Sequence, residues 1–515
     1  MFLSGKTMGN SRTKNSILNM MSSIGYQMVS LVMSFVSRTI FLQILGVGYL
    51  GINGLFNDVL SMLNMAELGF GTAMTFSMYK SLAEKDYDTI AGLTNFYKKV
   101  YRIIAATILG LGLLALPFLP YLINLNQDIP FVEVYYIIFL LCNVSSYLVT
   151  YKTTVLYADQ KNYLMLQHGA VWHVAEVCTM LCVLYISKNY MLYLITQLFF
   201  VYGRNFYMSH LASKHYPFLN KKIKLPKEKR KGIFKDVGSA FLYKISNVLL
   251  NATDNTLISF LISTEMVGLF SNYQIIIAKL SNLVGTMFTS LIASLGNLIV
   301  KESEGKRYNI FRSMQSLSMI ISTFCVTCLL LLEEDFIRIW LGEKYVLSSF
   351  ALLAIVFNFY FNVSTKPVVT FREAAGLFRK TKFIMLWTAG LNIVFSILLG
   401  KVIGLAGIML ATSISKLLTC FWYEPKLLYN EYFKKPCRLY FVEMALGTLV
   451  IGVSVVLSWI ATKWFIPSNW GELVIKGIMV SLVSIVTIVV FYRKTEGFKM
   501  LYSKGITIVQ KVIKK

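Results

Sequence analysis

The sequence predicts an all-α polytopic membrane protein with about fourteen transmembrane helices. Three observations predict this fold class: long apolar stretches recur from residue 17 to residue 492, lysine and arginine collect in alternate breaks between them, and part of the chain repeats at a constant distance. Of the 515 residues, 56% are hydrophobic and only 15% are charged. A soluble chain of this length would show helices with one polar face, whereas these segments are apolar all round.

Each predicted span is close to the ~20 residues that a bilayer requires. The centres fall near residues 30, 65, 110, 143, 176, 200, 249, 282, 321, 356, 391, 414, 450 and 481. The start, "MFLSGKTMGNSRTKNS", lacks a short apolar core followed by a small-residue cleavage site, so the first span is expected to remain in the mature chain.

The distribution of positive charge predicts the orientation of these spans. Forty of the fifty lysines and arginines lie at the two termini or in every second loop, and only five lie in the opposite loops. Positive loops mark the cytoplasmic side of a membrane protein. Both termini are therefore predicted to be cytoplasmic. The net charge of +25 belongs to loops at the membrane surface, where membrane lipids are the expected partner, and no nucleic-acid partner is expected.

An internal repeat predicts how the spans are grouped. Residues 41–65 align with residues 258–282 at an offset of 217, which places Gly51 on Gly268. Six spans separate the copies, so both have the same orientation. Parallel repeats of this kind predict two six-helix bundles related by a pseudo-twofold axis along the membrane normal.

The repeat and the charge pattern together predict five regions. They are an N-terminal six-helix bundle (1–212), a basic cytoplasmic linker (213–235), a C-terminal six-helix bundle (236–430), two additional transmembrane helices (431–492) and a cytoplasmic amphipathic tail (493–515).

Four local motifs occur in a recognisable order. They are "LGVGYLGINGL", "ELGFGTAM", "TDNTLISFLISTEMVGLFS" and "EAAGLFRKTKF". With the two bundles, the linker and the two extra helices, the chain resembles the polysaccharide flippases (oligosaccharide-lipid translocases) of the multidrug/oligosaccharidyl-lipid/polysaccharide exporter superfamily. The resemblance covers nearly the whole chain.

The resemblance implies a MATE-like transporter in the cytoplasmic membrane of a bacterium. It would flip undecaprenyl-pyrophosphate-linked oligosaccharide repeat units by alternating access, for capsule or exopolysaccharide synthesis. The implied partners are the lipid-linked oligosaccharide and, by functional coupling, glycosyltransferases and a polymerase. A monomer is expected.

Ionisable side chains inside the spans are candidate site residues, because each costs about 2.5–3.5 kcal/mol at the bilayer centre. The sequence places there Arg38, Glu67, His168, His173, Glu176, Lys244, Asp254, Lys279 and Lys416. Four cations are predicted to bind the pyrophosphate, namely Arg38, Lys244, Lys279 and Lys416. A cavity with this balance prefers anions to the cationic substrates of a drug exporter.

Asp254 and Glu67 are predicted to act in ion coupling or in a gate. At the offset of 217, Arg38 falls on Asn255, one residue from Asp254, so the pair is expected at similar depth in facing bundles. Arg38 and Asp254 could latch an outer gate, Asp254 could accept a coupling cation while Arg38 binds pyrophosphate, or the two could make no contact. No cofactor is expected apart from a coupling Na+ or H+.

Polar residues in the first spans of each half are predicted to line a wet passage for sugars. They are Asn53, Asn57, Asn247, Asn251 and Asn272. In the fifth span, His173 and Glu176 are three residues apart and share a helix face. These two side chains suit polar packing or a proton relay, and no third or fourth ligand for a metal is found beside them.

Other function classes remain as alternatives. A membrane polysaccharide polymerase would need catalytic groups in a large outer loop, but the longest one, around residues 333–347, offers no nucleophile–base pair. No catalytic residue and no metal site are therefore predicted. Among transporters, a lipid II-type flippase and a cation-coupled multidrug exporter are the alternatives.

Overall fold

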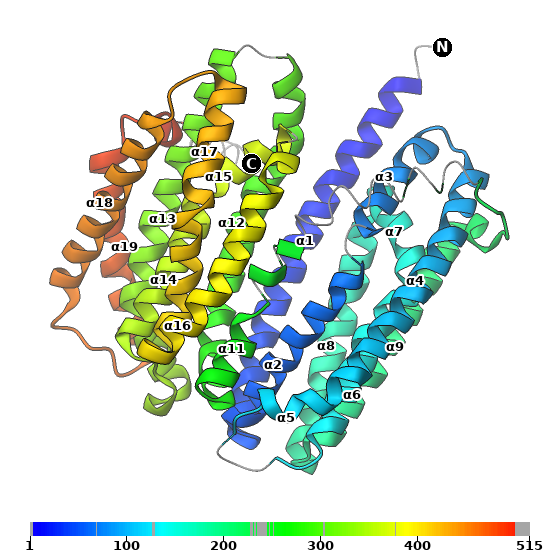
Figure 1. Cartoon of the computed structure of the whole chain (residues 1–515), viewed down its shortest axis with the longest axis horizontal. Coiled ribbons are helices and arrows are strands. Elements are labelled where there is room, and N and C mark those ends of the chain that lie inside the picture. Colours follow the sequence, from blue (N-terminus) through cyan, green and yellow to red (C-terminus); the bar gives the residue numbers. More distant parts are fainter. Residues whose placement is uncertain are drawn as a thin grey trace. The chain divides into compact units, whose positions relative to one another are not determined.

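The computed structural model describes residues 4–67, 70–125, 129–226, 230, 233, 245–246, 248–250, 252–301, 304–375 and 377–499. Every regular element in this part of the chain is a helix, which confirms the predicted fold class (Figure 1). Eight segments of it are long and apolar enough to cross a membrane, or nine if one bent pair counts as a span. The number fourteen stays a prediction.

The chain divides after Gly268 into two compact units. The helices that start in the first unit are α1 (Ser4–Ile44), α2 (Val47–Leu63), η1 (Asn64–Glu67), α3 (Phe70–Ala83), α4 (Tyr87–Ala115), η2 (Leu116–Phe118), α5 (Leu119–Leu122), α6 (Val132–Tyr147), α7 (Thr150–Ala158), α8 (Asn162–Ser187), α9 (Tyr190–His215), η3 (Pro217–Asn220), α11 (Asp254–Leu261) and α12 (Thr264–Lys301). Figure 1 shows α1 in blue, with α4, α6, α8 and α9 in cyan to green.

The second unit begins at Leu269, within α12. Its further helices are α13 (Glu304–Leu341), η4 (Glu343–Tyr345), α14 (Ser349–Ser364), α15 (Lys366–Ala374), α16 (Phe378–Leu418), α17 (Cys420–Leu428), η5 (Tyr429–Phe433), α18 (Arg438–Thr462) and α19 (Trp470–Tyr492). Helices α13, α18 and α19 pack on one another, so the two additional C-terminal helices belong to the same compact unit as α13.

The division after Gly268 lies beyond the predicted linker because α11 packs on α2 and α5 of the first unit. The predicted region boundaries therefore stay predictions. Residues 227–229, 231–232 and 234–235 of the linker, and residues 500–515 of the amphipathic tail, lie outside the described residues.

The internal repeat is visible in the positions where helices begin. Three pairs of helix starts have the predicted separation: Val47 with Thr264 (264 − 47 = 217), Tyr87 with Glu304 (304 − 87 = 217) and Val132 with Ser349 (349 − 132 = 217). The same offset therefore relates the element boundaries of the two halves as well as their residue patterns.

Several helices start where a side chain can accept a backbone hydrogen bond. Asp86 caps α4, Asn189 caps α9, Ser348 caps α14 and Asn469 caps α19. Such oxygens satisfy N–H groups that have no partner inside the helix. In the middle of α16, Gly404 has φ +60°, and this left-handed residue separates the spans predicted near residues 391 and 414.

Three predicted spans are broken rather than continuous. Near residue 65, α2 ends at Leu63 and α3 begins at Phe70, and near residue 143 the pair α6 and α7 is bent by 50°. Near residue 249, Ala252 and Thr253 form a bend before α11. Broken helices persist in membranes where neighbouring helices satisfy the freed backbone groups.

Two further boundaries differ from the sequence pattern. Residues 333–341, predicted as part of an outer loop, continue α13 to Leu341. The charged residues there can remain helical because Arg338 contacts Glu334 and Asp335 on the same helix. In the first unit, α9 continues to His215.

The start of the predicted linker is anchored on the first unit. The hydroxyl of Tyr216 donates to the Asp159 carboxylate, and the Asn95 side chain donates to the carbonyl of Lys221 at 2.6 Å. Burial, followed by the hydrogen bond to Asp159, raises the pKa of the Tyr216 hydroxyl above its ordinary value. Tyr216 therefore stays a neutral donor to Asp159 throughout the physiological pH range.

Candidate functional site

Two glycines lie at a close helix crossing in the first unit. A Cβ atom on Gly51 of α2 would lie 1.8 Å from the carbonyl oxygen of Thr264, and one on Gly268 of α12 would lie 2.4 Å from the carbonyl oxygen of Val47. Neither position can hold a side chain without moving backbone. Gly51 and Gly268 are the pair that the repeat aligns, so equivalent positions of the two halves meet here.

An aspartate of α2 caps α11. Both oxygens of Asp58 bind Asn255: Oδ2 accepts its backbone N–H at 2.9 Å, and Oδ1 accepts its Nδ2–H at 2.9 Å. Asp58 is only 8% exposed. Thr253, at the N-cap of α11, makes no side-chain cap of its own. Asp254 lies in the same first turn, so two carboxylates lie near the positive end of α11.

The loop after α5 closes the same junction with hydrogen bonds. The backbone of Asn124 exchanges bonds with Thr264, whose N–H donates to the Asn124 carbonyl at 2.7 Å. The Asn124 side chain donates to the Ile262 carbonyl at 3.0 Å, and Ser259 donates to the Leu122 carbonyl at 2.7 Å. We call this contact of α2, α11, the start of α12 and the α5 loop the helix junction. The predicted topology places it at the outer side.

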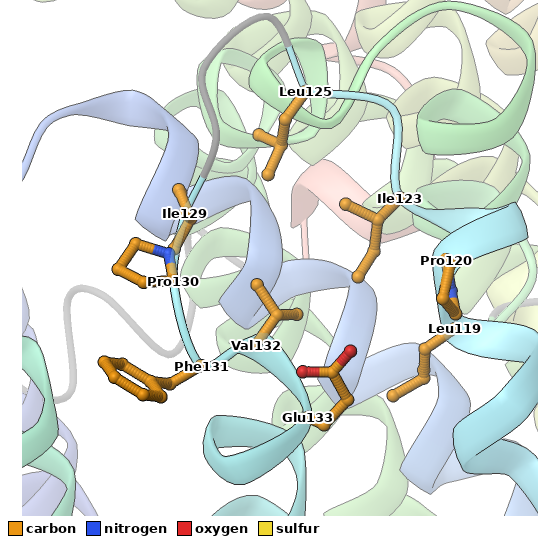
Figure 2. A pocket seen from close by; sticks show the side chains of 9 residues that line it. All are labelled: Leu119, Pro120, Ile123, Leu125, Ile129, Pro130, Phe131, Val132 and Glu133. Atoms are coloured by element: carbon orange, nitrogen blue, oxygen red, sulfur yellow. The ribbon is translucent and has the colours of Figure 1, made fainter.

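A cavity of about 510 Å³ opens beside the α5 loop (Figure 2). It is lined by Leu119, Pro120, Ile123, Leu125, Ile129, Pro130, Phe131, Val132 and Glu133. Among the described residues of this lining, Glu133 is the one that carries a charge. None of the described lining residues is a cation that could bind a phosphate, and the four cations predicted to bind pyrophosphate lie elsewhere in the chain.

A row of charged side chains crosses the first unit between α1, α8 and α9. Glu176 of α8 lies 3.5 Å from a guanidinium nitrogen of Arg204 on α9 and 4.0 Å from Nδ1 of His173. One turn further along α8, Nδ1 of His168 lies 2.9 Å from the Tyr207 hydroxyl.

Arg38 extends this row toward the outer end. Tyr193 of α9 interacts electrostatically with both Arg38 and Glu176. Arg38 lies six residues before the end of α1, or ~9 Å along the helix, and Arg204 lies fourteen residues after the start of α9, or ~21 Å. We call Arg38, His168, His173, Glu176 and Arg204 the charge ladder. It contains two permanent cations, two histidines and one acid.

Asp58 and Arg204 were not among the candidates from sequence. Asp58 sits in "LFNDVLSM", where one acid between apolar residues was the available signal. The span predicted near residue 200 leaves Arg204 close to its cytoplasmic end, where an arginine is typical of a loop, whereas α9 continues beyond Arg204 to His215. Its partner Glu176 was the signal for an inward-facing arginine.

The remaining predicted residues of the first unit lie in two places. Glu67 in η1 accepts a hydrogen bond from the Tyr101 hydroxyl at 3.0 Å, among α3, α4 and α6. Asn53 accepts one from Tyr190, and the Asn57 side chain donates to the Asn53 carbonyl at 2.8 Å. Asn53 and Asn57 are on α2, the helix of the junction. The pairing of Arg38 with Asp254 stays a prediction.

The predicted residues of the second unit are on α12 and α16. The Lys416 ammonium donates to the Asn362 side chain at 2.7 Å. Lys279 is half-buried on α12, and Asn272 on the same helix is fully buried. Lys244, Asn247 and Asn251 lie outside the described residues. Among the described side chains, no group of three or more His, Cys, Asp or Glu residues could hold a metal ion.

No protein-family profile and no curated protein sequence matches the chain. Among solved structures, the chain is similar to a lipid II flippase MurJ in an inward closed conformation, with a TM-score of 0.65 and 15% identity over 93% of this chain and 99% of that one. It is also similar to an inward-facing multidrug resistance MATE family transporter of the MOP superfamily, with a TM-score of 0.59 and 11% identity over 82% of this chain and 95% of that one.

A third similar structure is the MATE multidrug transporter DinF-BH, with a TM-score of 0.60 and 14% identity over 81% of this chain and 97% of that one. At these identities the likeness shows the fold. The chain therefore has the fold that this flippase and these multidrug transporters share.

Proposed function

We propose that the chain is an alternating-access transporter that flips undecaprenyl-pyrophosphate-linked oligosaccharide repeat units across the cytoplasmic membrane of a bacterium. The fold supports the transporter class, since flippases and exporters share it. The observation that carries the anionic substrate is the charge ladder, in which Arg38, Arg204 and two histidines accompany the single acid Glu176.

The chemistry of a lipid pyrophosphate fits this ladder. A guanidinium group binds phosphate oxygens through a planar fork, and its attraction is stronger where water is scarce. Glu176 holds Arg204 in place until an anion of higher charge competes for it. A cationic drug would meet repulsion from the same side chains, so the ladder favours a flippase over a drug exporter.

A lipid II-type flippase remains the alternative that the ladder equally supports, because its substrate is also a lipid-linked anion. The two functions differ in the sugars that the passage must admit. Asn53 and Asn57 on α2, with Asn272 on α12, are the described polar residues that we propose for sugar contact.

The helix junction is the proposed outer gate. Its opening would break the two bonds from Asn255 to Asp58 and those of Asn124. Asp254 in the first turn of α11 would then reach water, which suits either a latch with Arg38 or uptake of a coupling Na+ or H+. We propose both roles for Asp254 on the grounds of its position alone.

The test replaces Arg204. We expect Arg204→Gln to reduce flipping of a fluorescent undecaprenyl-pyrophosphate oligosaccharide in liposomes by about tenfold or more, because a charge-assisted bond of about 1.5–3 kcal/mol is lost. Arg102→Gln is the control, since Arg102 is an exposed arginine on α4 outside the ladder.

Three outcomes would contradict the proposal. If wild type flips lipid II but no oligosaccharide repeat unit, the alternative flippase holds. Export of a cationic dye without any flipping would place the chain among drug exporters. Equal flipping by both variants would remove the ladder from the substrate path.

A further inference from the structure

Glu333 in α13 of the second unit is a buried carboxylate whose oxygens accept no hydrogen bond. The residue is 3% exposed, and both of its oxygens lie out of contact with solvent and with every hydrogen-bond donor of the described chain. It lies eight residues before Leu341, or ~12 Å from the end of the helix, in a segment apolar enough to cross a membrane. An ionised carboxylate in such a place needs a compensating positive charge.

The bases near this end of α13 are already bound to other acids. Arg338 lies 2.6 Å from Glu334, 2.7 Å from Asp335 and 2.6 Å from Glu343. The second base is Lys476 of α19, whose ammonium lies 2.6 Å from the other Asp335 oxygen. Neither base is therefore available to neutralise Glu333.

The local charge balance is negative although the chain as a whole carries +25. Among the described residues, the charged and titratable groups at this end are Glu333, Glu334, Asp335 and Arg338 on α13, Tyr273 on α12, Glu343, Lys344 and Tyr345 in η4, Lys463 at the end of α18, and Glu472 and Lys476 on α19. Five acids thus accompany four bases. One base, Lys344, is exposed and lies over the Tyr345 ring, 5.1 Å from its centre.

Tyr273 connects Glu333 to the loop before α14. Its hydroxyl is within electrostatic reach of Glu333 and Glu334. The same hydroxyl accepts the backbone N–H of Leu347 at 2.9 Å. A charge on Glu333 therefore acts on the contact that holds the loop of residues 342–348 against α12.

We propose that Glu333 is a cation-binding site at the outer end of the second unit, where its carboxylate takes up a proton or Na+ from the outer side. A proton and Na+ act alike here, because each is a monovalent cation that neutralises the buried carboxylate. With the cation bound, Glu333 packs as a neutral group beside Tyr273. Without it, the ionised carboxylate favours hydration, which separates α12 from the loop. The site is independent of the charge ladder and of Asp254.

The test measures binding on the purified full-length protein in detergent, without any transport substrate. In one arm, NaCl replaces choline chloride step by step at constant pH and ionic strength. In the other arm, the pH is lowered from about 8 to about 5 at a constant Na+ concentration. A ligand that binds the folded state raises the unfolding temperature. We expect one of the two arms to raise the unfolding temperature of the wild type by about 2 °C or more.

Glu333→Gln should lose this rise, because the amide is uncharged in every buffer. Glu334→Gln is the matched control, since it removes a neighbouring acid that is already paired with Arg338 and should keep the rise. Glu333→Asp keeps the charge and should show the rise only at a higher cation concentration. This variant provides the test if the Glu333→Gln protein fails to fold.

The responding arm identifies the cation as Na+ or a proton. The proposal is overturned if wild type, Glu333→Gln and Glu334→Gln respond equally in both arms, or if Glu334→Gln alone loses the response. Since no substrate is present, either result leaves the flippase proposal untouched, and a failure of that proposal leaves this measurement valid.

Discussion

Asp58 shows how a single carboxylate can be kept among apolar helices at moderate cost. It accepts two hydrogen bonds from Asn255 and faces the positive end of α11. Both interactions favour its negative charge, so the residue needs no lysine or arginine as a partner. The same bonds fix α11 to α2, which gives Asp58 a positioning role in the helix junction.

We expect Asp58→Ala to weaken the junction, because the backbone N–H of Asn255 loses its acceptor. The free energy of unfolding should fall by about 1–3 kcal/mol, and less for Asp58→Asn, which keeps an acceptor oxygen. A second measurement is the rate at which an impermeant maleimide labels a cysteine placed at Ser259, in a background without the seven native cysteines.

Asp88→Ala is the control for Asp58, since Asp88 is an exposed aspartate paired with Lys221 in the same unit. Asp88→Ala should leave both the free energy of unfolding and the labelling rate close to their wild-type values. If labelling and stability are the same in all variants, Asp58 does not hold the junction.

The candidate site could be predicted from sequence only where a charge stands out against a clearly apolar run. Arg38 and Glu176 were found in that way, and the structure brings both near Tyr193. Arg204 was missed because hydropathy locates the end of a span to within a few residues, and an arginine near that end is read as a loop residue. Whether such an arginine lies inside the span depends on charge pairing with neighbouring helices, and hydropathy carries no information about that pairing.

At the scale of elements, the helix junction depends on backbone contact between α2 and α12. Gly51 and Gly268 allow it because each would place a Cβ atom against a carbonyl oxygen. The hydrophobic effect does not drive helices together in lipid. Small residues at a crossing let the backbones approach closely, so van der Waals packing stabilises the contact instead.

We expect Gly51→Ala to abolish flipping, because a Cβ atom 1.8 Å from the Thr264 oxygen forces the helices apart. The matched control is Gly25→Ala on α1, where a Cβ atom meets nothing within 4 Å. Alanine favours the helical state by about 0.5–1 kcal/mol over glycine, so the control should unfold at the wild-type temperature or slightly above it.

Flipping in liposomes and unfolding temperature in detergent distinguish the two variants. Normal flipping by Gly51→Ala at unchanged stability would show that the contact opens without cost, and the junction would then have no role as a gate.

Element type and order could be predicted from the sequence, but the breaks inside elements could not. The three broken spans retain their apolar composition, and a bend at Ala252 and Thr253 changes the mean hydropathy very little. Such a bend depends on acceptors and donors from other helices, as Asp58 supplies to α11. The helical extension of α13 has the same origin, because the pairs of Arg338 compensate charges that the pattern indicated as a loop.

At the scale of the whole molecule, the predicted topology makes both termini cytoplasmic. Its basis is the distribution of basic residues between the two sides, forty to five from the sequence and thirty-nine to five once Arg204 is placed within α9. Three exposed lysines lie on loops or helix ends that the topology assigns to different sides, namely Lys188, Lys463 and Lys222.

We expect cysteines at positions 188 and 463 to react with an impermeant maleimide in intact cells, and a cysteine at position 222 to react only after the cells are opened. The native cysteines are removed beforehand, and reaction of all three sites after lysis is the control for accessibility. Labelling of position 222 in intact cells, with protection of the other two, would invert the topology.

The meeting of Gly51 with Gly268 has a consequence for the history of the chain. If both halves descend from one six-helix protein that paired with itself, a self-complementary contact would have used the same residue from each partner. One ancestral codon would then have encoded both glycines, and a mutation in it would have replaced both residues of the contact at once. After duplication and fusion, separate codons would have encoded the two glycines. The halves could then change independently, one acquiring Asp58 and the other Glu333.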